Sequence, residues 1–392
     1  MPSEKAPGET ATRLYSFLVE EEDARVCRDI PEEACTDVPK NFLKLGASQT
    51  LTKLADELSS AKTVLPWVLT SLGAPPGLIG FLVPIRESGS LLPQLFIAAA
   101  VRSRPLRKRV WAVGGVLQAL ALFGMCVVVA LLRGFTAGLA ILALLIMFSL
   151  ARGLVSVASK DVTGKTIPKT RRGRLTGFTS SLSGILTLAL GAALTALIPG
   201  DPGTWALLLL LAAAAGLWLF ASGLFLTVQE TPGATEGGKD GIKEALARLT
   251  LLKTDPAFRR FVWVRALLVS TGLAAPFYVT LARESSAGGN LLGFFVLASG
   301  LATAVASGFW GRRSDSSSRS VLVSAALMAS TLGLAVFLLD FFGLVQRFSW
   351  IAPLAFFFLA IAHSGIRVGR KTYLLDMASG IRRTDYVAVS NS

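Results

Sequence analysis

Ten apolar segments, each long enough to cross a lipid bilayer, are the feature that most constrains how this chain folds. They lie at about 56–73, 77–101, 110–132, 138–158, 178–198, 205–228, 259–282, 291–310, 321–340 and 350–368. A helix of about 20 apolar residues spans the hydrocarbon core of a bilayer, and only helices or closed barrels satisfy their backbone groups there. Because 52% of the 392 residues are hydrophobic, we predict an all-α integral membrane protein.

The basic residues predict how these segments are oriented. They gather in the loops at 102–109 and 160–174, whereas the loops of the opposite side contribute only Arg133, Arg283 and Arg347. Short basic loops stay in the cytoplasm, so we expect a cytoplasmic N-terminus in a bacterial inner (plasma) membrane. The start of the chain also lacks a signal peptide's basic stretch and apolar core. This distribution accounts for most of the net charge of +14 without a nucleic-acid partner.

Short sequence patterns recur in the two halves of the chain. Lys160 followed by Arg171-Arg172 is matched 211 positions later by Lys371 followed by Arg382-Arg383, and "IGFLV" at 79–83 resembles "LGFFV" at 292–296. A duplicated six-helix unit is one architecture of secondary transporters. An eleventh span begins at Tyr386, and the counterparts of spans five and six would fall at about 389–439, so we expect twelve spans in the full-length protein.

This pattern predicts four regions. They are a cytosolic N-terminal segment (1–54), a six-helix half (55–228), a cytosolic linker with an amphipathic helix (229–258), and a second half (259–392) with spans seven to ten and the start of span eleven. Within the linker, "TDP" at 254–256 predicts a helix cap with proline at the first helical position.

Two six-helix halves, a basic linker and a cytosolic N-terminus resemble the major facilitator superfamily. The loop "GRRSDSSSR" supplies a family motif with Gly311, Asp315 and Arg319, whereas the equivalent loop "AVRSRPLRKR" of the first half lacks the glycine and the aspartate. The resemblance implies two halves related by a pseudo-twofold axis and a monomeric secondary transporter. The aspartate is expected to cap a neighbouring helix and to pair with Arg319 as a cytoplasmic gate; the alternative is an ordinary solvated turn.

Ionisable residues occur inside several of the apolar segments. A charge in hydrocarbon costs a few kcal/mol even on the mildest scale, so such residues face a cavity or one another. We predict a substrate and proton cavity lined by Asp56, Lys62, Arg86, Glu87, Arg152, Arg265, His363 and Arg367. Since basic groups outnumber acidic ones even with Glu57 included, the cavity favours an anionic or zwitterionic solute.

Glu87 is the leading candidate for proton coupling, because a carboxylate beside a cavity can bind and release a proton as the cavity opens to either side. Asp56 and Glu57 are weaker candidates, since the predicted first span places them near its cytoplasmic end. His363 has the only imidazole, a group whose ordinary pKa suits switching near neutrality, but a lone histidine is more often hydrogen-bonded scaffolding. In an alternative interpretation, Arg86 and Glu87 pair with Lys62, Arg152 or Asp56 only to hold the helices together.

Small residues recur every seven positions along two of the predicted spans. They are Gly177, Gly184 and Gly191 in span five and Gly293 and Gly300 in span eight. Such faces let helices approach closely, and in the related family these two helices meet between the halves. We therefore predict inter-half packing at these glycines, whether static or sliding.

Several functional classes are excluded by missing residues. "VTGKTIPK" lacks the upstream glycine of a phosphate-binding loop, and one histidine with three cysteines makes no metal site or catalytic constellation. We therefore predict a permease without cofactors, not an enzyme. It moves a small organic solute by alternating access with proton coupling, and its partners are the lipid bilayer, the solute and protons. The alternative is a non-transporting membrane sensor or scaffold.

Overall fold

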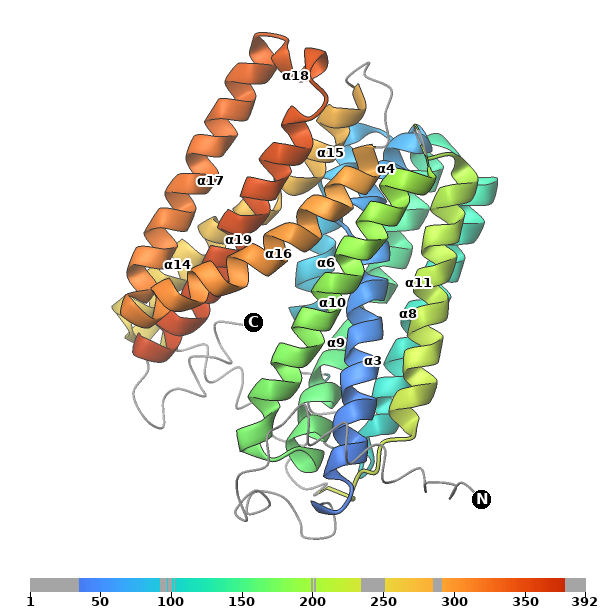
Figure 1. The fold of residues 1–392 in the computed structure, drawn as a ribbon, viewed down its shortest axis with the longest axis vertical. Helices are drawn as coiled ribbons and strands as arrows, with labels where there is room; N and C mark the ends of the chain where they lie inside the picture. Colours follow the sequence, from blue (N-terminus) through green and yellow to red (C-terminus); the bar gives the residue numbers. More distant parts are fainter. Residues whose placement is uncertain are drawn as a thin grey trace, which may run out of the picture.

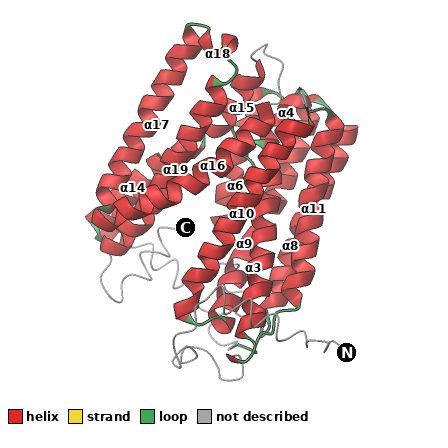
Figure 2. Cartoon of the chain, viewed as in Figure 1, coloured by secondary structure: helices red, strands yellow, loops and turns green. Residues whose placement is uncertain are grey.

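A computed structural model describes residues 35–91, 97, 101, 103–198, 200, 202–233, 251–284 and 291–377. Every regular element in these ranges is a helix (Figure 2). Seven helical segments are long and apolar enough to cross a membrane, and Leu291–Ala306 is a shorter apolar helix. The all-α membrane fold is thus confirmed, whereas the total of ten spans stays a prediction.

The first half of the chain contains eight described helices: α3 (Val38–Leu58), α4 (Val64–Ser71), α5 (Pro76–Ile79), α6 (Leu82–Leu91), α8 (Arg107–Leu131), α9 (Gly134–Thr166), α10 (Lys169–Leu197) and α11 (Thr204–Leu226). The second half contains α13 (Leu251–Thr254), α14 (Pro256–Val269), the 3₁₀ turn η1 (Ser270–Gly272), α15 (Ala275–Glu284), α16 (Leu291–Ser316), α17 (Ser318–Phe341), α18 (Leu344–Arg347) and α19 (Ile351–Met377). Most of the predicted amphipathic helix of the linker lies outside the described residues.

The helices repeat with the same spacing as the sequence. Arg107 begins α8 and Ser318 begins α17, 211 positions apart, and the ends of α9 and α19 at Thr166 and Met377 have the same separation. Figure 1 shows the two sets of helices as two bundles. The cap predicted at "TDP" also forms, because the Asp255 side chain accepts a 3.0 Å hydrogen bond from the backbone N–H of Phe258 and Pro256 begins α14.

The predicted start of the first span at residue 56 is wrong, because α3 begins at Val38. Its early turns are polar, and apolarity alone did not identify them as part of the bundle. The polar side chains are satisfied internally: Asn41 is fully buried and exchanges two 2.9 Å hydrogen bonds with the backbone of Gln229, and the Thr50 hydroxyl donates to the Gly46 carbonyl. Residues 38–54 therefore belong to the first half.

Aromatic rings fill the core of the first half between α8, α9 and α11. Trp111 stacks on Phe225 with ring centroids 3.9 Å apart, and Phe148 meets Trp218 edge to face at 6.3 Å. All four side chains are at most 1% exposed. Helices in lipid associate through such packing rather than through a hydrophobic effect between them, so this cluster makes the first half a tightly packed body.

The two halves meet chiefly along α10 and α16. We call the end of the bundle where α8 and α10 begin the basic end, and the opposite end, where α10 terminates at Leu197, the far end. A Cβ added to Gly191 would lie 2.6 Å from the backbone nitrogen of Leu297, and one added to Gly293 would lie 2.8 Å from that of Thr195. These two glycines thus allow backbone to approach backbone near the far end.

Closer to the basic end the contact between α10 and α16 loosens. An added Cβ at Gly300 would still lie 3.1 Å from the Leu188 side chain, but one at Gly184 or Gly177 would meet no atom of the described residues within 4 Å. Close inter-half packing is therefore seen at Gly191, Gly293 and Gly300, and at Gly177 and Gly184 it stays a prediction. The two bundles lean together at the far end and diverge toward the basic end (Figure 1).

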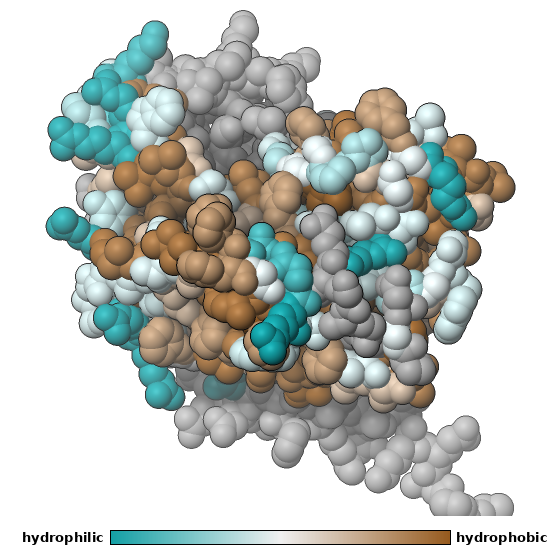
Figure 3. Space-filling view, turned by 90° about the horizontal axis from the view of Figure 1, so that it is seen from above, coloured by the Kyte–Doolittle hydropathy of each residue, from teal (hydrophilic) through white to brown (hydrophobic). Residues whose placement is uncertain are grey.

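The outer surface agrees with a lipid environment, because large apolar side chains such as Leu197, Leu267 and Phe341 are 72–77% exposed. Figure 3, seen from the far end, shows apolar and hydrophilic residues side by side on that end of the bundle.

Candidate functional site

A broken helix in each half faces the space between the halves. In the first half, Ser59–Thr63 separate α3 from α4, and in the second half Ser270–Ala274 separate α14 from α15, again 211 positions apart. Helix ends expose backbone groups that lack an intrahelical partner. Side chains meet part of this need, since the Ser60 hydroxyl accepts a 3.2 Å hydrogen bond from the Lys62 backbone N–H.

A cavity of about 180 Å³ lies between the two breaks. The first half lines it with Glu57, Ser60 and Lys62, and its other polar walls come from the second half: Thr271, Ser299, Thr303, His363, Ser364 and Arg367. Phe356 and Leu359 of α19 supply apolar surface. The cavity therefore combines one carboxylate, two cations, an imidazole and several hydroxyl groups drawn from both halves.

Asp56 does not line this cavity but joins three helices within the first half. Its Oδ1 lies 2.9 Å from Arg86 Nη2 of α6, and its Oδ2 pairs with the Arg152 guanidinium of α9. The Arg86 guanidinium also lies over the Phe148 ring, 4.8 Å from its centroid. Asp56 is only 18% exposed and Arg86 15%, so this cluster connects paired charges directly to the aromatic core.

Glu57 points the other way, because successive residues of a helix project about 100° apart. Its carboxylate lines the cavity near Ser299 of α16 and interacts electrostatically with Lys62 and Asp56. The Oε1 atom is buried and has no hydrogen-bond partner among the residues that the structure describes. The sequence placed Asp56 and Glu57 at the start of the first span, whereas they lie in the last turn of α3, which begins at Val38.

His363 is positioned by the break in the second half. Its Nδ1 lies 3.1 Å from the Thr271 hydroxyl oxygen, and a Cβ added to Gly272 would lie 2.9 Å from the imidazole ring. Lys62, Arg367 and Arg370 are its electrostatic neighbours. Since both ring contacts come from Ser270–Ala274, His363 couples α19 to the broken helix.

The remaining predicted cavity residues lie elsewhere. Glu87 of α6 is exposed and does not line the cavity, although it interacts electrostatically with Lys62 and Arg370. Arg265 of α14 is near Arg370 and is likewise absent from the cavity wall. Of the eight residues predicted from the sequence, Lys62, His363 and Arg367 line the cavity, while Asp56, Arg86 and Arg152 form the ion-pair cluster beside it.

A contact at the far end connects the halves above the cavity. The Arg283 guanidinium of α15 donates a 3.0 Å hydrogen bond to the Trp67 carbonyl of α4 and lies 5.4 Å from the centroid of its ring. Together with the close approach of α10 and α16, this contact closes the far end. In the sequence, Arg283 is recognisable only as a loop charge, and no local pattern marks Trp67 as its partner.

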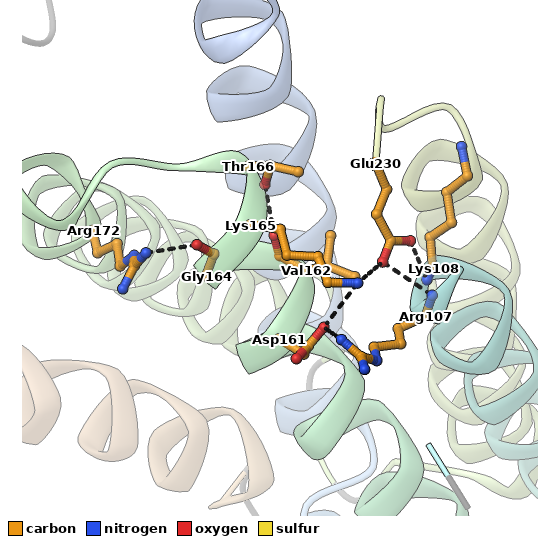
Figure 4. A network of polar contacts seen from close by, with 9 residues as sticks. All are labelled: Arg107, Lys108, Asp161, Val162, Gly164, Lys165, Thr166, Arg172 and Glu230. Atoms are coloured by element: carbon orange, nitrogen blue, oxygen red, sulfur yellow. Dashed lines mark hydrogen bonds and ion pairs between the residues drawn. The ribbon is translucent and has the colours of Figure 1, made fainter. Parts of the chain in front are cut away.

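At the basic end, a polar network joins α8, α9 and the segment after α11 (Figure 4). The Glu230 side chain is fully buried and accepts hydrogen bonds of 3.0 and 2.8 Å from the backbone N–H groups of Arg107 and Lys108. Lys165 bridges Glu230 at 3.1 Å and Asp161 at 3.2 Å, and Asp161 also pairs with Arg107 at 2.5 Å. Glu230 thus caps the N-terminus of α8, although a residue more than 120 positions away has no sequence signal for this role.

The equivalent helix start in the second half is capped locally. The Ser317 hydroxyl accepts a 3.2 Å hydrogen bond from the backbone N–H of Ser320 at the start of α17. Gly311 and Asp315 belong to the last turns of α16, and their side-chain positions lie outside the described residues; Arg319 is exposed on α17. The expected cap by Asp315 therefore stays a prediction.

Comparison with known proteins identifies the family. The family model of the Major Facilitator Superfamily matches residues 57–392, so the chain belongs to this superfamily of secondary transporters. No curated protein sequence matches the chain at a significant level.

Solved structures with similar folds include a D-xylose-proton symporter, with a TM-score of 0.65, 15% identity, and coverage of 89% of this chain and 86% of that one. An inward open conformation of the xylose transporter XylE from E. coli has a TM-score of 0.63 at 13% identity and covers 90% and 86%. The nucleoside transporter NupG has a TM-score of 0.62 at 12% identity and covers 90% and 87%. At these identities the similarity establishes the fold.

Proposed function

We propose that the protein moves a small organic solute, anionic or zwitterionic, through the cavity between its halves by alternating access coupled to protons. The observation that carries this proposal is the cavity itself, which lies between two helix breaks and is lined by charged groups of both halves. Broken helices that face a cavity at a repeat interface are typical binding sites of secondary transporters. Two cations and an imidazole against one carboxylate favour a solute with a negative group.

The basic end is proposed to face the cytoplasm, because the loops there carry most of the lysine and arginine residues. With the far end closed by Gly191, Gly293 and the Arg283–Trp67 contact, the described conformation then corresponds to an inward-facing state. An inner-membrane location, a cytoplasmic N-terminus and a monomeric protein belong to the same proposal.

For proton coupling, two carboxylates are candidates. Asp56 is supported by its ion pairs with Arg86 and Arg152, since protonation removes both attractions and frees α3 from α6 and α9. Glu87, the candidate from the sequence, is supported by its exposure and by its interactions with Lys62 and Arg370. We place Asp56 first because its charge joins three helices, so a change of protonation there changes helix packing.

The test measures charge movement by proteoliposomes on a solid-supported membrane. Solutes of different charge are applied with and without a pH gradient: L-alanine, L-lactate, propionate, choline, D-xylose and uridine. Wild type is expected to respond to at least one anionic or zwitterionic solute. Asp56→Asn is expected to retain solute counterflow but to lose pH-driven accumulation. Asp340→Asn serves as the control, because Asp340 is a half-buried residue of the far end whose carboxylate accepts a hydrogen bond from Gln346.

Glu87→Gln separates the two coupling candidates. If pH-driven accumulation survives Asp56→Asn and disappears in Glu87→Gln, Glu87 is the coupling residue. A response to D-xylose or uridine alone would contradict the charge preference and would favour a hydroxylated neutral solute, for which the hydroxyl groups of the cavity are suitable. If folded protein moves none of the solutes, the alternative of a sensor or scaffold gains support.

A further inference from the structure

We propose that Glu57 is a specificity-determining residue that accepts a hydrogen bond from an ammonium or hydroxyl group of the transported solute, next to the solute's negative group. This inference rests on the transport function proposed above and names the class of solute. The class consists of small carboxylates, or similar anions, that carry a hydrogen-bond donor beside the anionic group.

The first argument is the state of the Glu57 carboxylate. It lines the inter-half cavity, and its Oε1 atom is buried without a hydrogen-bond partner in the described part of the chain. A buried carboxylate oxygen without a partner is costly, since it has lost water and gained no donor. Lys62 interacts with it electrostatically but forms no ion pair with it among the described residues. A donor of the solute meets this need directly.

The second argument is the contrast with Asp56. Asp56 is already compensated by two guanidinium groups inside the first half. Glu57 is the next residue, faces the other way, and lies near Ser299 of the second half. Of these adjacent carboxylates, only Glu57 is placed to touch a solute and both halves at once.

The third argument is the composition of the rest of the cavity wall. Lys62 and Arg367 are cations that line the same cavity and are electrostatic neighbours of each other. A negative group of the solute is stabilised beside these cations, while a donor on the neighbouring carbon reaches toward Glu57. An anion without a donor leaves Oε1 unpartnered, so the cavity discriminates against it.

The experiment compares three solutes with the same three-carbon skeleton. L-alanine carries an ammonium group beside its carboxylate, L-lactate carries a hydroxyl group there, and propionate carries neither. Half-saturating concentrations are measured from currents or counterflow in wild type, Glu57→Gln and Glu57→Leu, with Asp340→Asn as the control. Size-exclusion profiles and thermal unfolding verify that each variant is folded.

Wild type is expected to prefer alanine or lactate over propionate by about 10- to 100-fold, the range for a hydrogen bond to a charged group. If the donor is the ammonium group, Glu57→Gln abolishes the preference for alanine. If it is the hydroxyl group, Glu57→Gln retains most of the preference for lactate, because the amide oxygen still accepts, and Glu57→Leu abolishes it. Asp340→Asn leaves the preference unchanged in either case.

Three results would overturn the inference while leaving the proposed function intact. The first is that propionate has the same half-saturating concentration as alanine and lactate. The second is that the preference survives Glu57→Leu. The third is that none of the three solutes is transported although another organic anion is. If no solute of the wider panel moves in folded wild-type protein, the proposed function and the inference are both wrong.

Discussion

A methyl group at Gly191 is predicted to open the far end of the molecule. The added Cβ would lie 2.6 Å from the backbone nitrogen of Leu297 and 2.9 Å from its Cα. Because these are backbone atoms, no change of rotamer relieves the contact, and α10 and α16 must separate. Ordinary van der Waals contact begins at 3.4 Å, so the helices are displaced by about 0.8 Å at this point.

Overpacking of a tight contact costs about 1–3 kcal/mol. In Gly191→Ala this cost falls on the conformation in which α10 and α16 touch, and it is relieved when the far end opens. The ratio of far-end-closed to far-end-open molecules is therefore expected to fall by about 5- to 150-fold. Gly184→Ala is the matched control, because it lies seven residues earlier in α10 and no atom of the described residues lies within 4 Å of the added Cβ.

Double electron–electron resonance between labels at Leu197 and Phe341 measures the opening. Both residues are near the far end, one in each half, and are 77% and 75% exposed. The labels are introduced without the native cysteines Cys27, Cys35 and Cys126. Gly191→Ala is expected to increase the population of long distances, whereas Gly184→Ala gives the wild-type distribution. Any gain in helix propensity is common to both substitutions and cancels in this comparison.

Equal distance distributions in the two folded variants would refute this reasoning. Such a result would mean that the close contact of α10 with α16 does not hold the far end closed. An increase of long distances in both variants would also refute it, since it would trace the effect to glycine replacement in α10 rather than to the contact at Leu297.

Substitutions at three further positions test the contacts that hold the helices in place. Arg283→Gln removes the charged donor to the Trp67 carbonyl and is expected to destabilise the conformation with a closed far end by about 1–2 kcal/mol. The population of long distances between labels at Leu197 and Phe341 is therefore expected to increase. Glu230→Gln removes the negative charge that caps α8 and pairs with Lys165. It is expected to lower the free energy of unfolding by about 2–4 kcal/mol, measured as thermal unfolding at a lower temperature. Asp255→Ala deletes the cap of α14 and is expected to cost about 1 kcal/mol in that assay, whereas Asp255→Asn retains most of the stability; equal unfolding of the alanine and asparagine variants would contradict this role.

Much of the fold followed from the sequence, because its signals are local or periodic. Apolar runs identify spanning helices through the thickness of the bilayer alone. A cap such as Asp255 acts on a backbone group three residues away, so its neighbours in the chain suffice to recognise it. The 211-residue offset found in the sequence recurs in the helix boundaries of both halves, whereas the two helix breaks were not predicted from it.

The start of the first helix was harder to predict from the sequence, because a helix inside a bundle need not be apolar. Polar residues at the start of α3 are tolerated where partners such as the Gln229 backbone satisfy them, and those partners are distant in sequence. The sequence therefore placed the start of the helix too late, and with it Asp56 and Glu57 too close to that start.

By itself the sequence determined the class of protein, its helices, its internal repeat and the types of charge that line the space between the halves. Only the tertiary structure decided which charges are compensated and which face the cavity. Asp56 and Glu57 are adjacent and chemically alike, yet one is paired with Arg86 and Arg152 and the other lines the cavity. The physical reason is that the 100° turn between neighbours on a helix directs them toward different helices, and the identity of those helices is set by long-range packing.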